Sequence, residues 1–446
     1  MPVANHAVSH ETQLARRLGL FDATMIVMGG IIGSGIFINP YVVARQVHTQ
    51  FLILGVWALG GLLALAAAFI WAELASRRPD VGGQYAYLRE AFHPAVAFLY
   101  GWVLLLVIQT GGMAAVAVTF SRYFLDMAPL PLSDAWLAAV VLSILTIINC
   151  LGVRAGSTVQ SIFMVLKIVA IIALVVSGLF FGGRHSPSSA TAAENMNLLT
   201  AIGAAMVPVL FAYGGWQTAT FVAAEIKEPE KNLARGLIFG VVGVVVLYLA
   251  ANFVYLHVLG PVGLAATTAP ASEVMRRAFG SVGARAIAAG IAISTVGFLS
   301  QSMLTAPRVY FAMASDRLFF KSVATVHPKT RAPVVAIAVQ GALAILIALW
   351  GRYEDILNYV VSMDFIFFGL TACCVFVFRS REGTADRKQI TRVPGHPLTT
   401  AIFIAVSWLV VINTIYHNPR NTLIGVAILI AGIPAYLFWQ WRKQDE

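Results

Sequence analysis

Charged residues are scarce in this 446-residue chain. Only 11% of its residues are Asp, Glu, Lys or Arg, whereas a soluble globular domain carries about 25%. Hydrophobic residues make up 59% of the chain, and apolar runs of about 18 residues or more recur along its whole length. A large apolar core in a soluble protein would not explain such recurring runs. The composition therefore predicts an all-α protein that crosses a membrane many times.

Features of other protein classes are also missing. Residues 1–20 are polar and lack the pattern of a cleavable signal peptide. The three cysteines, Cys150, Cys373 and Cys374, lie in apolar surroundings without the spacing of a metal site. Sets of His with Asp, Glu or Ser that would build a catalytic or metal centre are not apparent. We therefore expect no enzyme, no cofactor and no metal.

Twelve runs are long enough to span a bilayer, which needs about 20 residues. They cover residues 21–46, 50–76, 92–124, 133–151, 158–182, 198–224, 234–259, 283–313, 333–350, 355–378, 398–416 and 421–441. The connections between them are short, the longest lying near 183–197, 260–282, 314–332 and 379–397. Without a sizeable domain outside the membrane, the function should reside within it.

The basic residues predict the orientation of these spans. With both termini inside, the outer side carries few of the 30 Lys and Arg residues, namely Arg45, Arg122, Arg184, Arg276, Arg277, Arg285, Arg352 and Arg420. This asymmetry follows the positive-inside rule and places both termini in the cytoplasm. The net charge of +10 is thus explained by topology, and we expect no nucleic-acid partner.

Two spans are interrupted in the middle by small and polar residues. The first contains Gly33-Ser34-Gly35, and the sixth contains Gly214-Gly215 followed by Trp216-Gln217-Thr218. Free backbone groups survive in a membrane only where they line a protein or aqueous cavity. A half-helix that starts after such a break presents free N–H groups to a carboxylate, and one that ends before it presents carbonyls to an ammonium group.

Close helix packing is the alternative explanation for these glycines. We favour it for Gly236, Gly240 and Gly243 of the seventh span, which follow a small-residue spacing. Packing requires glycine on one face only, whereas Gly33-Ser34-Gly35 is clustered around the helix. Two breaks at corresponding places in the first and sixth spans are instead typical of a five-plus-five inverted repeat that binds an amino acid.

Three motifs resemble the amino acid–polyamine–organocation superfamily, and most closely its L-type amino acid transporter branch, in a bacterial form. They are Gly-Ser-Gly-Ile-Phe at 33–37, Phe-Ala-Tyr-Gly-Gly-Trp at 211–216 and Glu-Ile-Lys-Glu-Pro-Glu-Lys-Asn-Leu-Ala-Arg-Gly at 225–236. The resemblance implies a LeuT-like fold of twelve helices that works by alternating access, with helices 1 and 6 discontinuous. Its parts would be a cytoplasmic tail at 1–20, a first repeat at 21–182, a second at 198–378, two peripheral helices at 398–441 and a cytoplasmic tail at 442–446.

The resemblance also implies roles for residues at the breaks. Backbone N–H groups around Ser34, Gly35 and Ile36 would hold the substrate carboxylate. Carbonyls near Ile31, Phe211 and Gly214 would receive its ammonium group. The ring of Phe211 would act as a gate, Trp216 would pack at the start of the second half-helix, and Thr218 would form part of the pocket wall.

Lys167 lies within the fifth span, where a charge is costly and indicates function. Snorkelling to the interface is the alternative. The resemblance implies that the ammonium group takes the place of the sodium ion of sodium-coupled relatives. Its partners would be first-helix carbonyls and a polar residue of the eighth span, with Ser300 the first candidate and Ser294 the second.

Asp364 is the other charge in mid-membrane. It could be a proton-linked group, a gate element or a structural acceptor at a helix end. Glu225, after the sixth span, is expected to serve the inner gate and packing.

The sequence places no acidic residue close to either break, so we expect neutral L-amino acids as substrates, transported without sodium by uniport or exchange. Proton symport through Lys167 or Asp364 is the alternative. Relatives that join a glycoprotein do so through a cysteine after the third span, and residues 125–134 contain none. We therefore expect a monomer or loose oligomer in the cell inner membrane, without a covalent partner.

Overall fold

The computed structural model describes residues 18–444 except 129, 152, 184–196, 331, 351–352, 383–390 and 418. Helices dominate the described chain, and its β-type pairing is limited to one isolated parallel bridge between Leu18 and Ile226. The predicted all-α class is confirmed for this part of the chain. Most of the tail predicted at 1–20, and the end of the tail at 442–446, lie outside the described residues.

The helices are distributed along the whole described chain. They are α1 Leu20–Ile31, α2 Gly35–Val47, α3 Gln50–Arg77, α4 Gln84–Ala91, α5 Pro94–Val103, the π-helix η2 Leu104–Ile108, α6 Gln109–Met127, α7 Asp134–Cys150, α8 Val153–Phe181, α9 Leu198–Tyr213, α10 Thr218–Phe221, the 3-10 helix η3 Ala223–Glu225, α11 Pro229–Ala266, α12 Pro270–Thr305, α13 Pro307–Ser315, the 3-10 helix η4 Lys321–Ala324, α14 Val334–Trp350, α15 Tyr353–Glu382, α16 Leu398–His417 and α17 Pro419–Gln444.

Within the described residues, 9 helical segments are long and apolar enough to cross a membrane, and the bent pair of α1 and α2 makes up to 10. Two shorter apolar helices, α7 and α14, coincide with the predicted fourth and ninth spans. A multi-pass membrane protein is therefore supported. The count of twelve spans and the division into two inverted repeats remain predictions.

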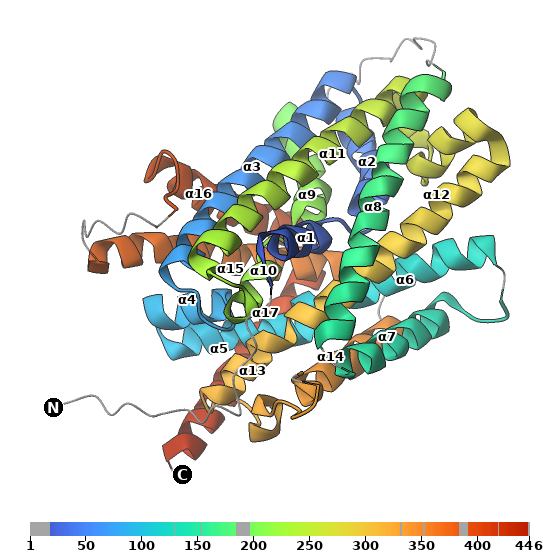
Figure 1. Ribbon diagram of the computed structural model, residues 1–446. Coiled ribbons are helices and arrows are strands. Elements are labelled where there is room, and N and C mark those ends of the chain that lie inside the picture. Colours follow the sequence, from blue (N-terminus) through green and yellow to red (C-terminus); the bar gives the residue numbers. More distant parts are fainter. Residues whose placement is uncertain are drawn as a thin grey trace.

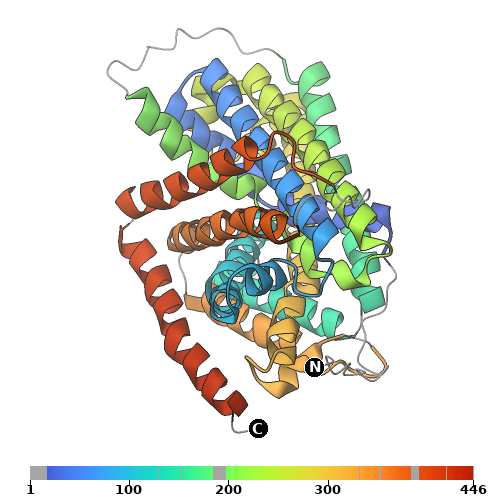
Figure 2. The same cartoon turned by 90° about the vertical axis from the view of Figure 1, so that its left-hand side faces the viewer.

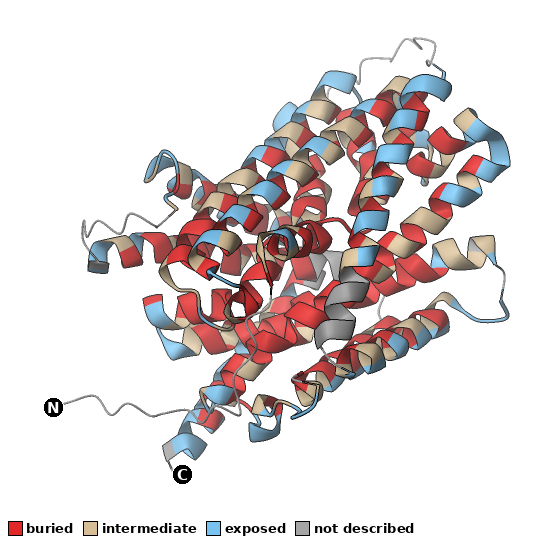
Figure 3. Ribbon diagram, in the orientation of Figure 1, coloured by how far each residue is buried: buried red, intermediate tan, exposed pale blue. Residues whose placement is uncertain are grey.

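The short helices α1 and α10 lie in the interior of the bundle, with the long helices α3, α8, α11 and α12 around them (Figure 1). Helices α16 and α17 run along one outer side (Figure 2), where α17 contacts α5 and α15. Buried residues concentrate around α1, whereas the outer helix faces are exposed (Figure 3). Large apolar side chains such as Leu62 and Val246 stand on those outer faces, as expected of surfaces that meet lipid.

The packing role predicted for the glycines of the seventh span is confirmed. A Cβ atom on Gly236 would lie 2.8 Å from Ala23 Cβ, and one on Gly240 would lie 2.6 Å from Val27 Cγ1. Helix α11 therefore approaches α1 more closely than any larger residue would allow, which fixes the first half of the broken span against a long, continuous helix.

The segment near 260–282, predicted as a polar connection between spans, is mostly helical in the structure. Helix α11 continues to Ala266 and α12 begins at Pro270, so most of this segment is helical. Gly260 and Gly280 interrupt the two helices with φ angles of 68° and 63°. Sequence hydropathy detected the polar character of this segment and missed its helical backbone.

Candidate functional site

The first predicted interruption is a break in the helix. Helix α1 ends at Ile31 and α2 begins at Gly35, with a bend of 42° between them. The N–H groups of Gly35 and Ile36 open α2 and have no carbonyl of their own helix to bind. Ser34 precedes them as a buried residue, and its hydroxyl has no hydrogen-bond partner among the described residues. The start of α2 can therefore receive an anionic group.

The second predicted interruption separates α9 from α10. Helix α9 ends at Tyr213, where the N–H of Gly214 closes it by donating to the carbonyl of Leu210 at 2.9 Å. Helix α10 begins at Thr218, whose hydroxyl donates to the carbonyl of Gly215 at 2.8 Å. The intervening residues thus form a turn held by its own hydrogen bonds, and the end of α9 presents carbonyl groups that suit an ammonium group.

The chain segments next to the two breaks approach each other closely at Gly30 and Gly215. A Cβ atom on Gly215 would overlap the carbonyl group of Gly30, and one on Gly30 would lie 2.6 Å from the carbonyl oxygen of Gly215. Tyr248 of α11 reinforces this close approach, because its hydroxyl lies 3.2 Å from both the Ile31 and the Ala212 carbonyl oxygens. The free ends of α1 and α9 are therefore held against each other by direct backbone contact.

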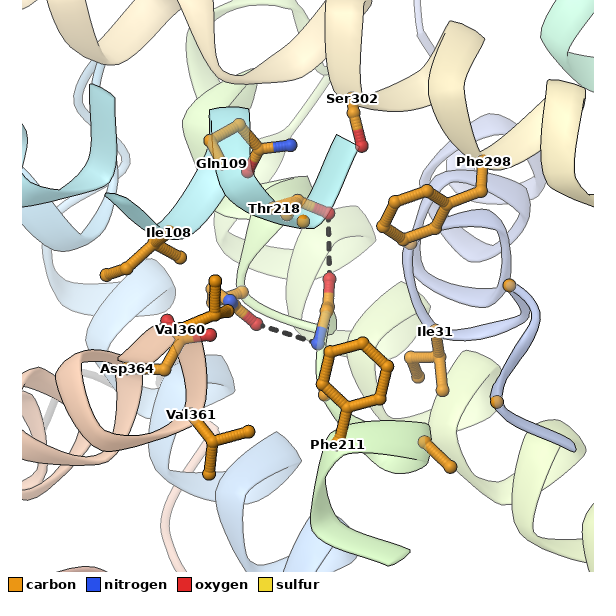
Figure 4. Close-up of a pocket in the computed structure, with 18 of the residues that line it drawn as sticks. Ile31, Ile108, Gln109, Phe211, Thr218, Phe298, Ser302, Val360, Val361 and Asp364 are labelled. Carbon is orange, nitrogen blue, oxygen red and sulfur yellow. Dashed lines mark hydrogen bonds between the residues drawn. The ribbon is translucent and has the colours of Figure 1, made fainter. Parts of the chain in front are cut away.

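A cavity lies between the breaks, with about 80 Å³ open to the centres of water molecules. One bound water needs about 10–15 Å³ by this measure, so the cavity has room for a small molecule. Figure 4 shows Phe211, Phe298 and Ile31 on one side of the view, with Asp364 and Val361 across from them. The predicted site residues that line the cavity are Ile31, Ser34, Gly35, Phe211, Gly214, Thr218 and Asp364.

Two of the predicted substrate and gate residues lie outside the cavity wall. Ile36 is buried behind it, so only its backbone N–H can serve a ligand. Trp216 is buried in an aromatic cluster, with ring centroids 5.1 Å from Phe368 and 6.0 Å from Trp71. Trp216 therefore packs behind the break, and Phe368 separates it from the space that a ligand would occupy, since Phe368 itself lines the cavity.

Lys167 lies midway along α8 and reaches the first break. Its ammonium group donates to the Ile32 carbonyl at 2.6 Å and to the Gly29 carbonyl at 3.4 Å. Only 1% of the residue is exposed, so it does not snorkel to a membrane surface. Gly297 of α12 makes room for it, because a Cβ atom there would lie 2.8 Å from Lys167 Cε. The lysine therefore neutralises the carbonyl end of α1.

The predicted hydrogen bond from Lys167 to the eighth span is not formed in this structure. The hydroxyls of Ser300 and Ser294 are buried on α12 without a hydrogen-bond partner among the described residues. The carbonyls exposed by the break satisfy the ammonium group instead, since they carry the negative end of the α1 dipole.

Comparison with known proteins identifies the family. The family profile described as amino acid permease matches residues 18–437. The chain belongs to this family. The permease is 31% identical over 450 residues to the serine/threonine exchanger SteT of Bacillus subtilis, an alignment covering 98% of this chain and 99% of the relative.

Mammalian relatives align over nearly the same length of the permease. The large neutral amino acids transporter small subunit 2 of Oryctolagus cuniculus is 30% identical, with 97% of this chain and 82% of the relative covered. The b(0,+)-type amino acid transporter 1 of Mus musculus is 29% identical, with 97% and 89% covered. These relatives are transporters and not enzymes. The predicted membership of the amino acid–polyamine–organocation superfamily, close to the L-type branch, is confirmed.

Several residues of the cavity wall were missed by the sequence analysis. Gln109, Gln217, Phe298 and Ser302 all line the cavity. Gln109 follows the π-helical turn η2, a local widening of the helix that often occurs at functional sites. The detectable signal was a polar residue in the middle of an apolar span. That signal alone does not reveal which of the polar residues in the spans face the cavity.

Asp364 adds an acidic group to the site. No acidic residue lies near either break in the sequence, but α15 brings Asp364 to the same cavity as Ser34 and Gly214. Its carboxylate makes no hydrogen bond or ion pair with the residues that the structure describes, so a role as a helix-end acceptor is not supported. The described cavity wall therefore contains one acidic group, although none lies near either break in the sequence.

A buried ion pair joins the segment after α10 to α13. Glu225 Oε1 accepts a hydrogen bond from Arg308 Nε at 2.8 Å, and both side chains are at most 4% exposed. The carbonyl of Glu225 also accepts the N–H of Leu18, two residues before the start of α1. One point therefore links the start of α1, the end of the sixth span and α13, in agreement with the packing role expected for Glu225.

Replacement of Glu225 by alanine should destabilise the permease by about 3–5 kcal/mol, because Arg308 would remain buried without its partner. Thermal unfolding in detergent measures the effect. The double variant Glu225→Gln with Arg308→Met removes both charges and should recover most of the loss. An unchanged unfolding temperature for Glu225→Ala would contradict the structural role of the pair.

Proposed function

We propose that this permease carries neutral L-amino acids across the cytoplasmic membrane by alternating access, without sodium, as an exchanger or a uniporter. The contact of Lys167 with the Gly29 and Ile32 carbonyls carries this proposal. A protein-borne ammonium group at the carbonyl end of α1 supplies the positive charge that a bound cation would supply there. The main observation that supports an amino acid as cargo is the cavity between two half-helix ends of opposite polarity.

In this proposal the substrate lies between the breaks. Its carboxylate meets the N–H groups of Gly35 and Ile36 and the hydroxyl of Ser34, where the dipole of α2 is positive. Its ammonium group meets the carbonyls of Ile31 and of the end of α9, from Phe211 to Gly214. Lys167 uses the neighbouring carbonyls of α1, and the Ile31 carbonyl, which accepts from Tyr248, has a second lone pair for the substrate. The Phe211 ring closes the space over it, and Trp216 supports the turn from behind.

The residues of the cavity wall are compatible with substrates whose side chain is neutral, with or without a hydroxyl group. Ile31, Ile108 and Val361 provide apolar contacts, while Ser302 and Gln109 provide polar ones. Serine and threonine are the substrates named for one bacterial relative, and large neutral amino acids for a mammalian one. We therefore include small hydroxylated amino acids among the proposed substrates.

The proposed topology follows the sequence prediction. Twelve spans form repeats at 21–182 and 198–378, with peripheral helices at 398–441 and both termini in the cytoplasm. The permease would act as a monomer or loose oligomer in the inner membrane. Although one relative is named a small subunit, the absence of cysteine from residues 125–134 supports action without a covalent partner.

Proton symport is the second candidate, and Asp364 favours it. An unpaired carboxylate that lines the cavity can bind a proton together with the substrate and release it on the other side. Lys167 could serve the same role by exchanging a proton while it stays between the Gly29 and Ile32 carbonyls.

Uptake of labelled L-serine and L-leucine into liposomes containing the purified permease tests these alternatives. We expect equal uptake in sodium and choline media, and faster uptake when the liposomes contain unlabelled substrate. Complete dependence on a sodium gradient would overturn the proposal.

An imposed pH gradient distinguishes the proton mechanism. If Asp364 carries a proton, an acidic outside should accelerate uptake by the native protein, and Asp364→Asn should abolish that acceleration. Exchange or uniport predicts the same uptake with and without the gradient.

A further inference from the structure

Gln301 of α12 is a buried glutamine that lies next to both breaks but outside the cavity wall. Helix α12 contacts both α1 and α10. The amide nitrogen of Gln301, Nε2, lies 2.8 Å from Thr218 Oγ1, and a Cβ atom on Gly30 would lie 3.3 Å from the same nitrogen. The amide is therefore placed where α12 meets the chain segments next to the two breaks.

The chemistry of its partners fixes the direction of two hydrogen bonds at Thr218. The carbonyl oxygen of Gly215, 2.8 Å from Thr218 Oγ1, can only accept, so the single hydroxyl hydrogen of Thr218 points to it. Figure 4 draws this bond as a dashed line from Thr218. The Thr218 oxygen then accepts from Gln301 Nε2. We call this chain of two bonds, from Gln301 through Thr218 to Gly215, the glutamine relay.

The glutamine relay holds the turn between α9 and α10. The N–H of Gly215 donates to Gln217 Oε1 at 3.1 Å, and the carbonyl of Gly215 accepts from Thr218. Both polar backbone groups of Gly215 are therefore bound by side chains of the same turn. Gln301 adds a restraint from outside the turn, because α12 packs against α6 and α8 as well as against α10.

The glutamine relay also determines what Thr218 can offer to a ligand. A hydroxyl group has one hydrogen and two lone pairs. The hydrogen is bound to Gly215 and one lone pair to Gln301, which leaves the second lone pair as an acceptor on a side chain that lines the cavity. Such an acceptor suits an ammonium group, which has only donors, and not a carboxylate, which has only acceptors. Without Gln301 the hydroxyl could rotate and turn its hydrogen toward the cavity.

We propose that Gln301 is a positioning residue for the ammonium group of the substrate. It keeps the Thr218 hydroxyl as an acceptor toward the cavity and fixes the turn at Gly215. Thr218 thereby joins the Ile31 carbonyl and the end of α9 as a third acceptor, which matches the three N–H donors of an ammonium group. This role rests on the proposed function, since it concerns the same substrate site, and adds to it a residue that does not touch the substrate.

Uptake of labelled L-serine and L-leucine into liposomes over a range of concentrations tests this role, because it separates KM from the maximal rate. Gln301→Met keeps a side chain of similar length without an N–H donor. We expect KM to rise about tenfold for both amino acids, with a maximal rate per folded protein within about twofold of the native value. A loss of packing alone would lower the amount of folded protein and leave KM unchanged, so an unchanged KM would overturn the role.

A double-mutant cycle with Thr218 tests the glutamine relay itself. Thr218→Val removes the hydroxyl group that Gln301 positions, so Gln301→Met should raise KM no further in that background. Thr218→Ser keeps the hydroxyl, and Gln301→Met should still raise KM about tenfold there. An equal rise of KM in the Thr218→Val background would show that Gln301 acts independently of Thr218 and would overturn the role.

Gln84→Met is the matched control. Gln84 of α4 is also fully buried, and its amide donates to the Phe367 carbonyl at 3.2 Å, outside the cavity wall, so KM should stay at the native value. A rise of KM for L-serine alone in Gln301→Met would assign the contact to the substrate hydroxyl and overturn the role at the ammonium group, which both amino acids share. A native permease that takes up neither amino acid would overturn the proposed function and this role with it, whereas native uptake with an unchanged KM in Gln301→Met would overturn this role alone.

Discussion

Replacement of Gly215 by alanine should abolish transport. Gly215 has a φ angle of 115°, which residues with a Cβ atom rarely adopt. The added methyl group would also overlap the carbonyl of Gly30 and lie 3.1 Å from the Ile31 nitrogen. Both neighbours are backbone atoms, so no side-chain rotation can relieve the overlap. The two half-helix ends must therefore separate.

Separation of the two half-helix ends would displace the groups that are proposed to bind the substrate. The Ile31 carbonyl and the end of α9 are brought together by this close approach and by Tyr248. A displacement of about 1 Å between groups that position a reactant can cost about 100-fold in rate, and we expect a loss of at least that size in liposome uptake. Gly30→Ala should have a comparable effect, because its Cβ atom would meet the Gly215 carbonyl and Thr218 Oγ1, each at 2.6 Å.

Gly55→Ala is the matched control. A Cβ atom at this exposed position on α3 would meet no atom within 4 Å, so transport should stay at the native level. Gel filtration of each variant shows whether the protein is folded. Native transport by a folded Gly215→Ala variant would show that close contact between the breaks is not required.

The sequence was sufficient to locate both breaks because the relevant signal is local. Glycine and serine in the middle of an apolar run are unfavourable both for helix formation and for insertion into a membrane. Such local conflicts are expected at functional sites. Lys167 was detectable for the same reason, since a charge in an apolar run has a high cost that must be offset. In the structure its side chain is buried and contacts the first break.

Contacts between distant segments could not be predicted in the same way. Asp364 and Gln109 line the cavity because of how α15 and α6 pack, and no short-range pattern encodes that packing. The π-helical turn before Gln109 shifts the register of the helix, which changes the direction of the residues that follow. The expected contact of Lys167 with Ser300 failed for a related reason: which donor or acceptor a buried ammonium group meets depends on distances of a few tenths of an ångström.

The second large effect is expected at Lys167. Replacement by alanine should abolish transport while the protein still inserts into the membrane. The variant removes the donor that now satisfies the Ile32 and Gly29 carbonyls. A hydrogen bond from a charged group contributes about 1.5–3 kcal/mol, so α1 would lose much of the restraint on its carbonyl end. The population with a binding-competent break should fall about 10- to 150-fold, and apparent affinity falls with it.

Two further substitutions separate the charge from the volume of the side chain. Lys167→Met keeps a similar length without the ammonium group and should be as inactive as Lys167→Ala. Val165→Ala, at a position on the same helix that is 48% exposed, should transport normally. Uptake in liposomes and gel filtration of the detergent-solubilised variants provide the measurements. Native uptake by Lys167→Met would refute the proposed role of the charge, because the methionine can fill the space between α8 and α12 but cannot neutralise the end of α1.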